Sequence, residues 1–265
     1  MKFSIVANPK QPNIKKILTR VIGFLEDFEL EEETSKIVGL SGNSITELQG
    51  DMVISLGGDG TLLHILSNLN KPVFGINCGG VGFLTAMEHS EDLFSAFKKL
   101  ESKNYELQKL HRIDAFINDL HIGTALNEVV LHSSRVAKIQ GFEIKIDGSV
   151  ADSFRGDGLI IATPTGSTSY AMSLGGPIIY PTLESHIIVP MAAYRIGARP
   201  LVIPSKYDIT ARITGHPEAV MVIDGQDEIM IKKDDKLLFK QSKEPVELVR
   251  FEDDFFDRVQ NKLRS

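Results

Sequence analysis

The sequence predicts an α/β first domain with a mainly parallel sheet, then a β-rich, sandwich-like domain, then a closing helix. Over residues 1–104, short apolar runs alternate with segments whose apolar residues recur every three or four positions. Over 105–250, apolar and polar residues alternate instead, as in antiparallel strands. Helical spacing returns over 251–265, at Phe255, Phe256, Val259 and Leu263.

In the first domain, the strands and helices follow one another at short spacing, which is typical of βαβ units. Residues 3–7 are apolar and β-prone, and Asn8–Pro9 ends them. The expected strands are residues 3–7, 36–40, 51–56 and 72–76. The expected helices begin at Ile14, cover about 61–69, and follow the stripe of Leu93, Phe94, Phe97 and Leu100.

In the second domain, the clearest strand is the one in which Phe142, Ile144 and Ile146 alternate with polar residues. Asp147–Gly148 follows it and predicts a tight hairpin turn, because both residue types tolerate the left-handed backbone that such turns need. Further strands are expected at 207–214, 219–223, 228–232, 236–240 and 245–251.

The composition and the net charge exclude several classes of protein. The 265 residues are 42% hydrophobic, enough for a substantial core, and no apolar run is long enough for a membrane span or a signal peptide. Cys78 is the single cysteine, so an intramolecular disulfide is excluded. The net charge of -6 offers no general positive field for nucleic acid or acidic lipid. We therefore expect a soluble, cytoplasmic protein without a nucleic-acid or membrane partner.

The apolar run 51–56 breaks into three glycines, Gly57, Gly58 and Gly60, which surround the carboxylate of Asp59. Glycines let a phosphate approach backbone N–H groups closely, so this turn is a candidate phosphate-donor loop with Asp59 at its mouth. The simpler interpretation is a tight turn from strand to helix in which Asp59 caps the helix. Both roles can hold together.

A second segment, Phe154–Pro177, gathers glycine, proline and hydroxyl side chains around one apolar strand, more than a hydrophobic core requires. Asn127–Glu128 is a third polar feature, with apolar residues on both sides that indicate a buried setting. Buried polar groups without partners cost about 1–3 kcal/mol each, so this pair is expected to bind something.

Four motifs occur in a fixed order: Gly-Gly-Asp-Gly at 57–60, Asn-Glu at 127–128, Thr-Pro-Thr-Gly-Ser-Thr-Ser-Tyr at 163–170 and Asp-Gly-Gln at 224–226. In these motifs the chain closely resembles the NAD kinase family over nearly its whole length. One residue departs from the family pattern: Ser169 stands where the family usually has Ala. The resemblance implies that the closing helix returns to the first domain.

The resemblance also implies a reaction, the transfer of a phosphoryl group from ATP or a related donor to the 2'-hydroxyl of the adenosine ribose of NAD, giving NADP. Asp59 would accept the hydroxyl proton. The NAD-binding residues would be Asp59, Gly60, His64, Phe83, Asn127, Glu128, Lys138, Arg155, Asp157, Thr168, Ser169, Tyr170, Ser173 and Gln226. Family pockets are completed across subunits, which implies a homodimer or homotetramer.

Several of these residues have a structural alternative. Lys138 could be a surface charge, Tyr170 a core aromatic, and Asp224–Gly225 before Gln226 simply a turn. The seven histidines and 35 carboxylates show no metal-ligand spacing, so Mg²⁺ is expected to arrive with the phosphate donor. The sequence leaves open whether the donor is ATP, another nucleoside triphosphate or polyphosphate, and whether NADH is accepted.

Two other functions stay open at this stage. Lipid and sphingoid-base kinases also use Gly-Gly-Asp-Gly, but the Asn127–Glu128 pair, the 163–170 block and the absence of a basic amphipathic segment disfavour them. A dinucleotide-binding sensor without transfer activity is disfavoured by the presence of Asp59. A conventional Rossmann dehydrogenase is disfavoured because no Gly-x-Gly-x-x-Gly follows the first strand.

Overall fold

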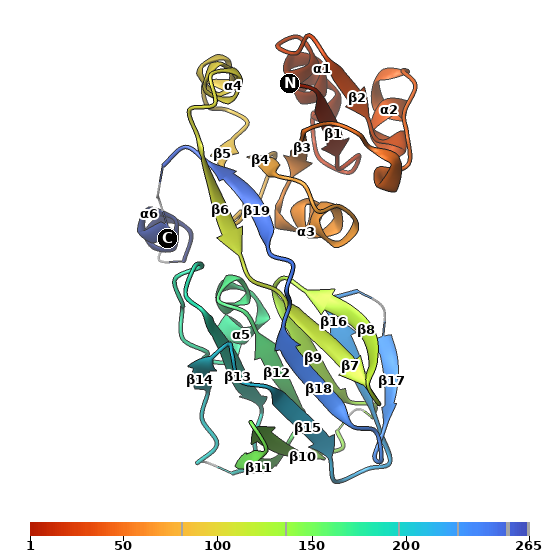
Figure 1. Ribbon diagram of the computed structural model, residues 1–265, viewed down its shortest axis with the longest axis vertical. Helices are drawn as coiled ribbons and strands as arrows, with labels where there is room; N and C mark the ends of the chain where they lie inside the picture. Colours follow the sequence, from red (N-terminus) through yellow and green to blue (C-terminus); the bar gives the residue numbers. More distant parts are fainter. Residues whose placement is uncertain (81, 136, 196, 227, 253–254, 264–265) are drawn as a thin grey trace. The chain divides into compact units, whose positions relative to one another are not determined.

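The computed structural model describes residues 1–80, 82–135, 137–195, 197–226, 228–252 and 255–263 (Figure 1). The chain forms two compact units. The first contains Met1–Lys109 together with Val246–Ser265, and the second contains Leu110–Pro245. The second unit is therefore inserted into the sequence of the first.

The first unit is built on a sheet with the strand order β2-β1-β3-β4-β19-β6, and β5 pairs with β4. The pairs β1–β2, β1–β3, β3–β4 and β4–β19 are parallel, which confirms the predicted α/β class. The strands are β1 (Phe3–Ala7), β2 (Phe28–Leu30), β3 (Met52–Gly57), β4 (Val73–Asn77), β5 (Met87–Glu88), β6 (Glu106–Leu110) and β19 (Val246–Arg250).

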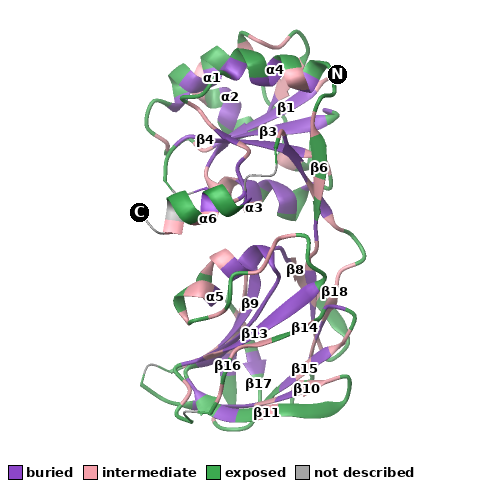
Figure 2. Ribbon diagram, turned by 90° about the vertical axis from the view of Figure 1, so that its left-hand side faces the viewer, coloured by how far each residue is buried: buried purple, intermediate pink, exposed green. Residues whose placement is uncertain are grey.

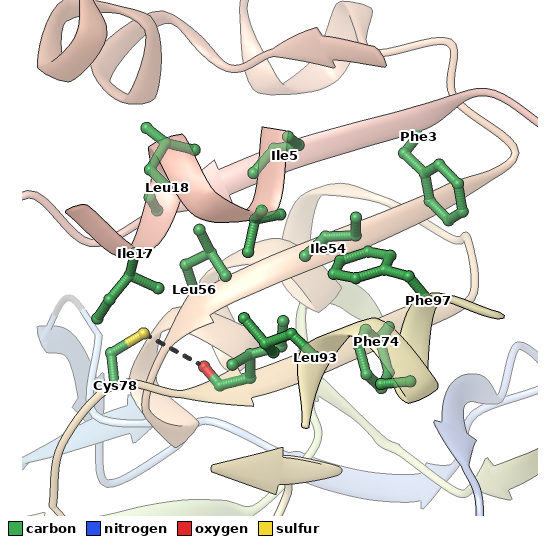
Figure 3. Close-up of a cluster of buried hydrophobic side chains, with 14 of the residues drawn as sticks. Phe3, Ile5, Ile17, Leu18, Ile54, Leu56, Phe74, Cys78, Leu93 and Phe97 are labelled. Carbon is green, nitrogen blue, oxygen red and sulfur yellow. Dashed lines mark hydrogen bonds between the residues drawn. The ribbon is translucent and has the colours of Figure 1, made fainter. Parts of the chain in front are cut away.

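Helices α1 and α4 bury their apolar stripes against this sheet. Ile17 and Leu18 of α1 belong to the same core cluster as Ile54, and Leu93 and Phe97 of α4 join it (Figure 3). The central strands β1, β3 and β4 are buried along their length (Figure 2). The helices are α1 (Ile14–Ile22), α2 (Glu32–Val38), the 3-10 turn η1 (Ile45–Glu47), α3 (Asp59–Asn68), α4 (Leu93–Glu101) and the closing α6 (Phe255–Leu263).

The strand expected at residues 36–40 is wrong, because this segment belongs largely to helix α2. The Glu31 carboxylate caps the helix by accepting the backbone N–H groups of Glu33 and Thr34, each at 2.9 Å. Gly39 ends the helix with a φ of 72°. The Thr34 hydroxyl is buried and accepts the backbone N–H of Ala7 at 2.8 Å. Helix α2 is therefore fixed by its cap, by β1 and by the partly buried Ile37 and Val38, which pack on the core.

The second unit contains two six-stranded antiparallel sheets, with the orders β11-β10-β15-β18-β7-β8 and β14-β13-β12-β9-β16-β17. One core cluster holds residues from both sheets, among them Phe142, Phe239, Leu131 and Ile161, so the sheets pack face to face as a sandwich. This confirms the predicted β-rich domain. The strands that frame the site are β8 (Leu120–Ala125), β9 (Glu128–Ser133), β10 (Gln140–Ile146), β11 (Ser149–Gly156), β12 (Gly158–Ala162), β16 (Glu218–Ile223) and β17 (Glu228–Lys232).

The remaining strands of this unit are β7 (Ile113–Ile117), β13 (Ser185–Met191), β14 (Leu201–Pro204), β15 (Ile209–Ile213) and β18 (Leu237–Gln241). The expected turn at Asp147–Gly148 joins β10 to β11, with φ values of 48° and 80°. The outer face of β12 and β13 packs on Ala171 of the short helix α5 (Tyr170–Ser173), which follows the 3-10 turn η2 (Thr165–Thr168). The hydroxyl-rich block is therefore anchored to the sheet.

Candidate active site

The glycine turn in the first unit leaves space that the packing of the protein does not require. Strand β3 ends at Gly57, and a Cβ there would clash with the Thr61 hydroxyl, so Gly57 is fixed by packing. A Cβ on Gly58 would meet nothing closer than 3.7 Å, and one on Gly60 nothing within 4 Å. Gly58 and Gly60 therefore keep a surface open beside the first turn of α3, where free N–H groups favour anions.

Asp59 occupies the first turn of α3, while the N-cap position is Gly58. Its carboxylate accepts two backbone N–H groups of the loop after β4: Oδ2 lies 2.8 Å from the nitrogen of Phe83, and Oδ1 lies 2.9 Å from that of Leu84. The residue remains partly exposed. The carboxylate is thus held in one orientation and keeps access to a ligand.

Asn77, fully buried at the end of β4, holds the start of this loop. Its amide donates to the carbonyl of Gly80 at 2.9 Å and to Glu88 at 3.0 Å. Cys78 beside it is buried, and burial together with the nearby Glu88 charge raises the pKa of its thiol to about 11. The thiol is therefore neutral and unreactive at physiological pH.

A cavity of about 420 Å³ adjoins the glycine turn at the carboxyl ends of β1 and β3. Ligands of parallel α/β sheets bind at this edge. His64, expected near the dinucleotide, lies in its wall. The lining residues are Val6, Ala7, Asn8, Pro9, Gln11, Glu31, Glu33, Gly58, Gly60, Thr61 and His64.

In the second unit, Asn127 and Glu128 lie where β8 turns into β9, and their backbone is fixed by Asp224. The Asp224 carboxylate accepts the N–H groups of Leu126, Asn127 and Glu128 at 2.6, 2.8 and 3.0 Å. Thr163 adds an N–H bond to the carbonyl of Asn127 at 2.9 Å. Asn127 is buried, yet in the described part of the chain its side-chain amide makes no hydrogen bond, so it is available to a ligand.

Glu128 is also buried. Its Oε1 accepts the hydroxyl of Ser169 at 3.1 Å, whereas its Oε2 is buried without a partner among the described residues. Burial and the nearby charge of Asp224 raise the pKa of Glu128 to about 7. A buried carboxyl that titrates near neutrality, with one unused oxygen, is a mark of a functional site.

The hydroxyl block lies at the same end of the sheet. A Cβ on Gly166 would meet the carbonyl of Asn127 at 2.1 Å, so this glycine allows the block to approach the Asn127–Glu128 turn. Thr168 and Ser169 are half-buried, while Tyr170 and Ser173 are exposed, so Tyr170 is not a core aromatic.

Asp224 opens the Asp-Gly-Gln motif, for which the sequence predicted a turn and a role for Gln226 but no role for the Asp224 side chain. It has a φ of 48°, and Gly225 follows with a φ of 68°, so the turn between β16 and β17 exists as well. The turn places the Asp224 carboxylate under the Asn127 backbone and leaves Gln226 exposed at the same end of the sheet. The sequence signal for this role was an aspartate directly after the apolar run 219–223.

Lys138, Arg155 and Asp157 form a second group, and all three are exposed. They lie at the other end of β12 from Asn127: Gly158 of β12 pairs with His132, and Ala162 pairs with Glu128. The two ends are separated by the length of β12, whose first and last residues lie roughly 13 Å apart. Within one chain, the second unit therefore presents two separate groups of the expected residues.

Comparison with known protein families assigns the chain. Residues 25–105 match the model of the ATP-NAD kinase N-terminal domain, and residues 126–251 match that of the C-terminal domain. The chain belongs to the NAD kinase family. The predicted resemblance is confirmed.

Individual relatives agree with this assignment. The chain is 37% identical to an NAD kinase of Methanosarcina acetivorans, with 99% of this chain and 98% of the relative covered. It is 37% identical to an NAD kinase of Thermoplasma volcanium, with 88% and 86% covered. Among solved structures, an NAD kinase from Archaeoglobus fulgidus in complex with ATP is 32% identical with a TM-score of 0.79, covering 100% of this chain and 99% of that one.

A second solved structure shares the fold at lower identity. Yeast NADH kinase complexed with NADH has a TM-score of 0.89 at 20% identity, with 100% of this chain and 87% of that one covered. As for membranes, the described helices include none that is long and apolar enough to cross a bilayer.

Proposed function

We propose that this member of the NAD kinase family phosphorylates the 2'-hydroxyl of the adenosine ribose of NAD, using ATP or a related donor, to give NADP. The main support for this proposal is the position of the Asp59 carboxylate. Its carboxylate is oriented by the N–H groups of Phe83 and Leu84 beside a turn whose Gly58 and Gly60 are left open by packing. In-line phosphoryl transfer needs a base for the hydroxyl and N–H groups for the phosphate, and this turn supplies both.

In this proposal, the donor phosphates approach Gly57, Gly58 and Gly60, beside the cavity whose wall includes His64. Mg²⁺ would come with the donor and neutralise its phosphate charge. The partly exposed Asp59 carboxylate is an oxygen donor of the kind Mg²⁺ takes alongside phosphate oxygens. Among the described residues, no three His, Cys, Asp or Glu side chains gather as a metal-binding group of their own.

We propose that the dinucleotide binds to the buried amide of Asn127, to the unpartnered oxygen of Glu128 and to the exposed side chains nearby. These neighbours are Thr168, Ser169, Tyr170, Ser173 and Gln226. In the first unit, we propose Asp59, Gly60, His64 and Phe83 as dinucleotide-binding residues.

Lys138, Arg155 and Asp157 stand apart from Asn127 along β12, and we propose that they complete the pocket of a second copy of the chain. The working protein would then be a homodimer or homotetramer, in the cytoplasm where NAD and ATP are available. In a closed symmetric dimer, each chain would supply the Asn127 group to its own pocket and the Arg155 group to the pocket of its partner.

Two alternatives make different predictions. A lipid or sphingoid-base kinase would not need the desolvated polar pair Asn127–Glu128, and a silent sensor would not need the oriented carboxylate of Asp59. Purified protein should be incubated with NAD or NADH and, in turn, ATP, other nucleoside triphosphates and polyphosphate, with Mg²⁺ present. We expect NADP with at least one donor. NAD binding without any NADP would favour the sensor, and phosphorylation of a lipid in place of NAD would favour the lipid kinase.

A further inference from the structure

Glu128, which is buried, and Asp224, which is half-buried, are neighbouring carboxyl groups whose surroundings differ. Asp224 accepts three backbone N–H groups, from Leu126, Asn127 and Glu128. Glu128 accepts one hydroxyl, from Ser169, and its second oxygen has no partner in the described structure. Because backbone N–H groups stabilise an ionised carboxylate, Asp224 is the member that keeps its charge, and Glu128 is the member that holds a proton most easily.

The pKa values agree with this division. Burial is the largest cause of a raised pKa in both groups, and the three N–H groups and Arg112 offset part of it in Asp224. For Glu128 the Asp224 charge adds to the effect of burial, and only the Ser169 hydroxyl opposes it. Among the described residues, Asp224, Ser169 and Arg112 are thus the polar or charged groups from neighbouring elements that act on this pair.

We propose that Glu128 gives up a proton to solvent when the dinucleotide binds, and that the Ser169 hydroxyl positions Glu128 and stabilises its ionised form. The inference rests on the proposed function. A ribose offers hydroxyl donors, and an ionised carboxylate accepts several of them, whereas a protonated one has its own O–H and fewer free lone pairs. Oε2 of Glu128 is the acceptor left open for such a donor.

The Ser169 hydroxyl lies 3.1 Å from Oε1 of Glu128. An alanine at this position would leave both carboxylate oxygens of Glu128 without a donor from this block. The Ser169 hydroxyl should therefore keep Glu128 ionised, and allow the dinucleotide to bind, at lower pH than an alanine would.

The first experiment measures the KM for NAD between about pH 6 and 9 in the parent protein, Ser169→Ala, Ser169→Thr and the control Ser149→Ala, whose hydroxyl is exposed on β11. In the parent, KM should rise as the pH falls through about 7. In Ser169→Ala the rise should begin at higher pH, with KM at pH 7 increased roughly threefold to tenfold, as for one net hydrogen bond. The kcat at saturating NAD should change little.

Ser169→Thr should restore the parent profile because it keeps the hydroxyl, and Ser149→Ala should match the parent. If the KM of Ser169→Ala is raised by the same factor at every pH, the positioning role is wrong. A purely structural defect would raise KM in this way, because it does not depend on the titration of Glu128.

A second experiment does not depend on turnover. Calorimetry of NAD binding at about pH 6.5, in buffers of different ionisation enthalpy, counts the protons released. The parent should release a proton fraction that disappears in Glu128→Gln, and its loss of NAD affinity at low pH should disappear as well. Equal proton release in parent and Glu128→Gln would refute the inference. A protein that binds NAD and releases the proton but makes no NADP would refute the proposed function alone.

Discussion

Oδ2 of Asp59 lies 2.8 Å from the backbone nitrogen of Phe83, and this hydrogen bond ties the proposed base to the loop after β4. The same carboxylate binds Leu84 through its other oxygen. An asparagine has only one acceptor oxygen, so it can keep one of these two bonds.

Asp59→Asn should therefore reduce turnover by at least about 10²-fold, because the proton acceptor is lost, while NAD binding should persist. Steady-state NADP formation and calorimetry with NAD measure the two effects. Asp119→Asn, at an exposed position on the second unit, is the control and should keep parent activity. Turnover within a few fold of the parent would rule out Asp59 as the general base.

Gly60→Ala separates folding from ligand binding. The added Cβ meets nothing within 4 Å and lies in a helix, where alanine is favoured over glycine by about 1 kcal/mol. Thermal stability should be equal or higher, while the KM for the phosphate donor should rise, because the methyl group occupies the surface that the phosphate approaches. An unchanged donor KM in the more stable variant would place the donor elsewhere.

Asn127→Ala should weaken NAD binding by roughly 1–3 kcal/mol, since the ligand loses its partner in a desolvated site. The turn itself should survive, because Asp224 and Thr163 hold the backbone of Asn127 and not its side chain. Calorimetry with NAD and a thermal melt measure the two properties, with the exposed Asn104→Ala as the matched control. A parent-like affinity would mean that Asn127 has only a structural role.

Arg155→Ala should impair NAD or NADP binding, with a loss that shrinks at high salt, while adenosine binding should change little. Arg212→Ala, another exposed arginine of the same sheet, should have no such effect. Equal, salt-independent losses for adenosine, NAD and NADP would show that Arg155 shapes its loop instead.

If Arg155 serves the pocket of a second copy, mixing Asn127→Ala with Arg155→Ala should restore activity at low NAD. If the two variants form dimers at random, about half of the dimers are mixed, and one of the two pockets in each mixed dimer has both native residues. Up to about a quarter of all pockets would then be native. Activity equal to the mean of the two separate variants would mean that each pocket draws both residues from one chain.

His186 of β13 predicts acid sensitivity. It is 1% exposed and neither ring nitrogen has a partner in the described structure; burial, then the charge of His111, lowers its pKa to about 4 from 6.5. The pKa of His186 is lower in the folded state than in the unfolded state, so protonation favours unfolding. Above pH 6.5 the folded protein has no such penalty. As the pH falls from 6.5 to about 4, the free energy of unfolding should drop by up to roughly 3 kcal/mol. His111 and Glu184 are the neighbouring titratable groups.

Urea unfolding of the parent and His186→Leu between about pH 4 and 7.5 tests this. The variant should lose less stability on acidification, since leucine takes up no proton. Parallel curves for the two proteins would assign the acid sensitivity to other groups.

The sequence predicted the fold where burial follows a simple period. Ile17 and Leu18 of α1 and the alternating residues of β10 lie in the cores, as their spacing indicates. Helix α2 was missed because its stability comes from the Glu31 cap and from the contact of Thr34 with Ala7, which is distant in the chain. Such tertiary contacts leave no periodic signal.

The site was predictable as a set of motifs but not as an arrangement. The sequence pointed to Asn127 and Glu128, yet the backbone role of Asp224, 97 residues from Asn127, depends on the pairing of β9 with β16. Nor did any motif indicate that Arg155 and Asn127 would lie at opposite ends of β12.

The inserted position of the second unit also sets an order of assembly on the ribosome. Strand β19, which lies between β4 and β6 in the first sheet, is synthesised only after residues 110–245. The N-terminal half therefore leaves the ribosome with an incomplete sheet, and it must wait for the whole second unit before β19 and α6 can join it. A nascent chain stalled at residue 245 already contains all of Leu110–Pro245 but has a gap beside β4, and chaperone binding to such stalled chains should map to that gap.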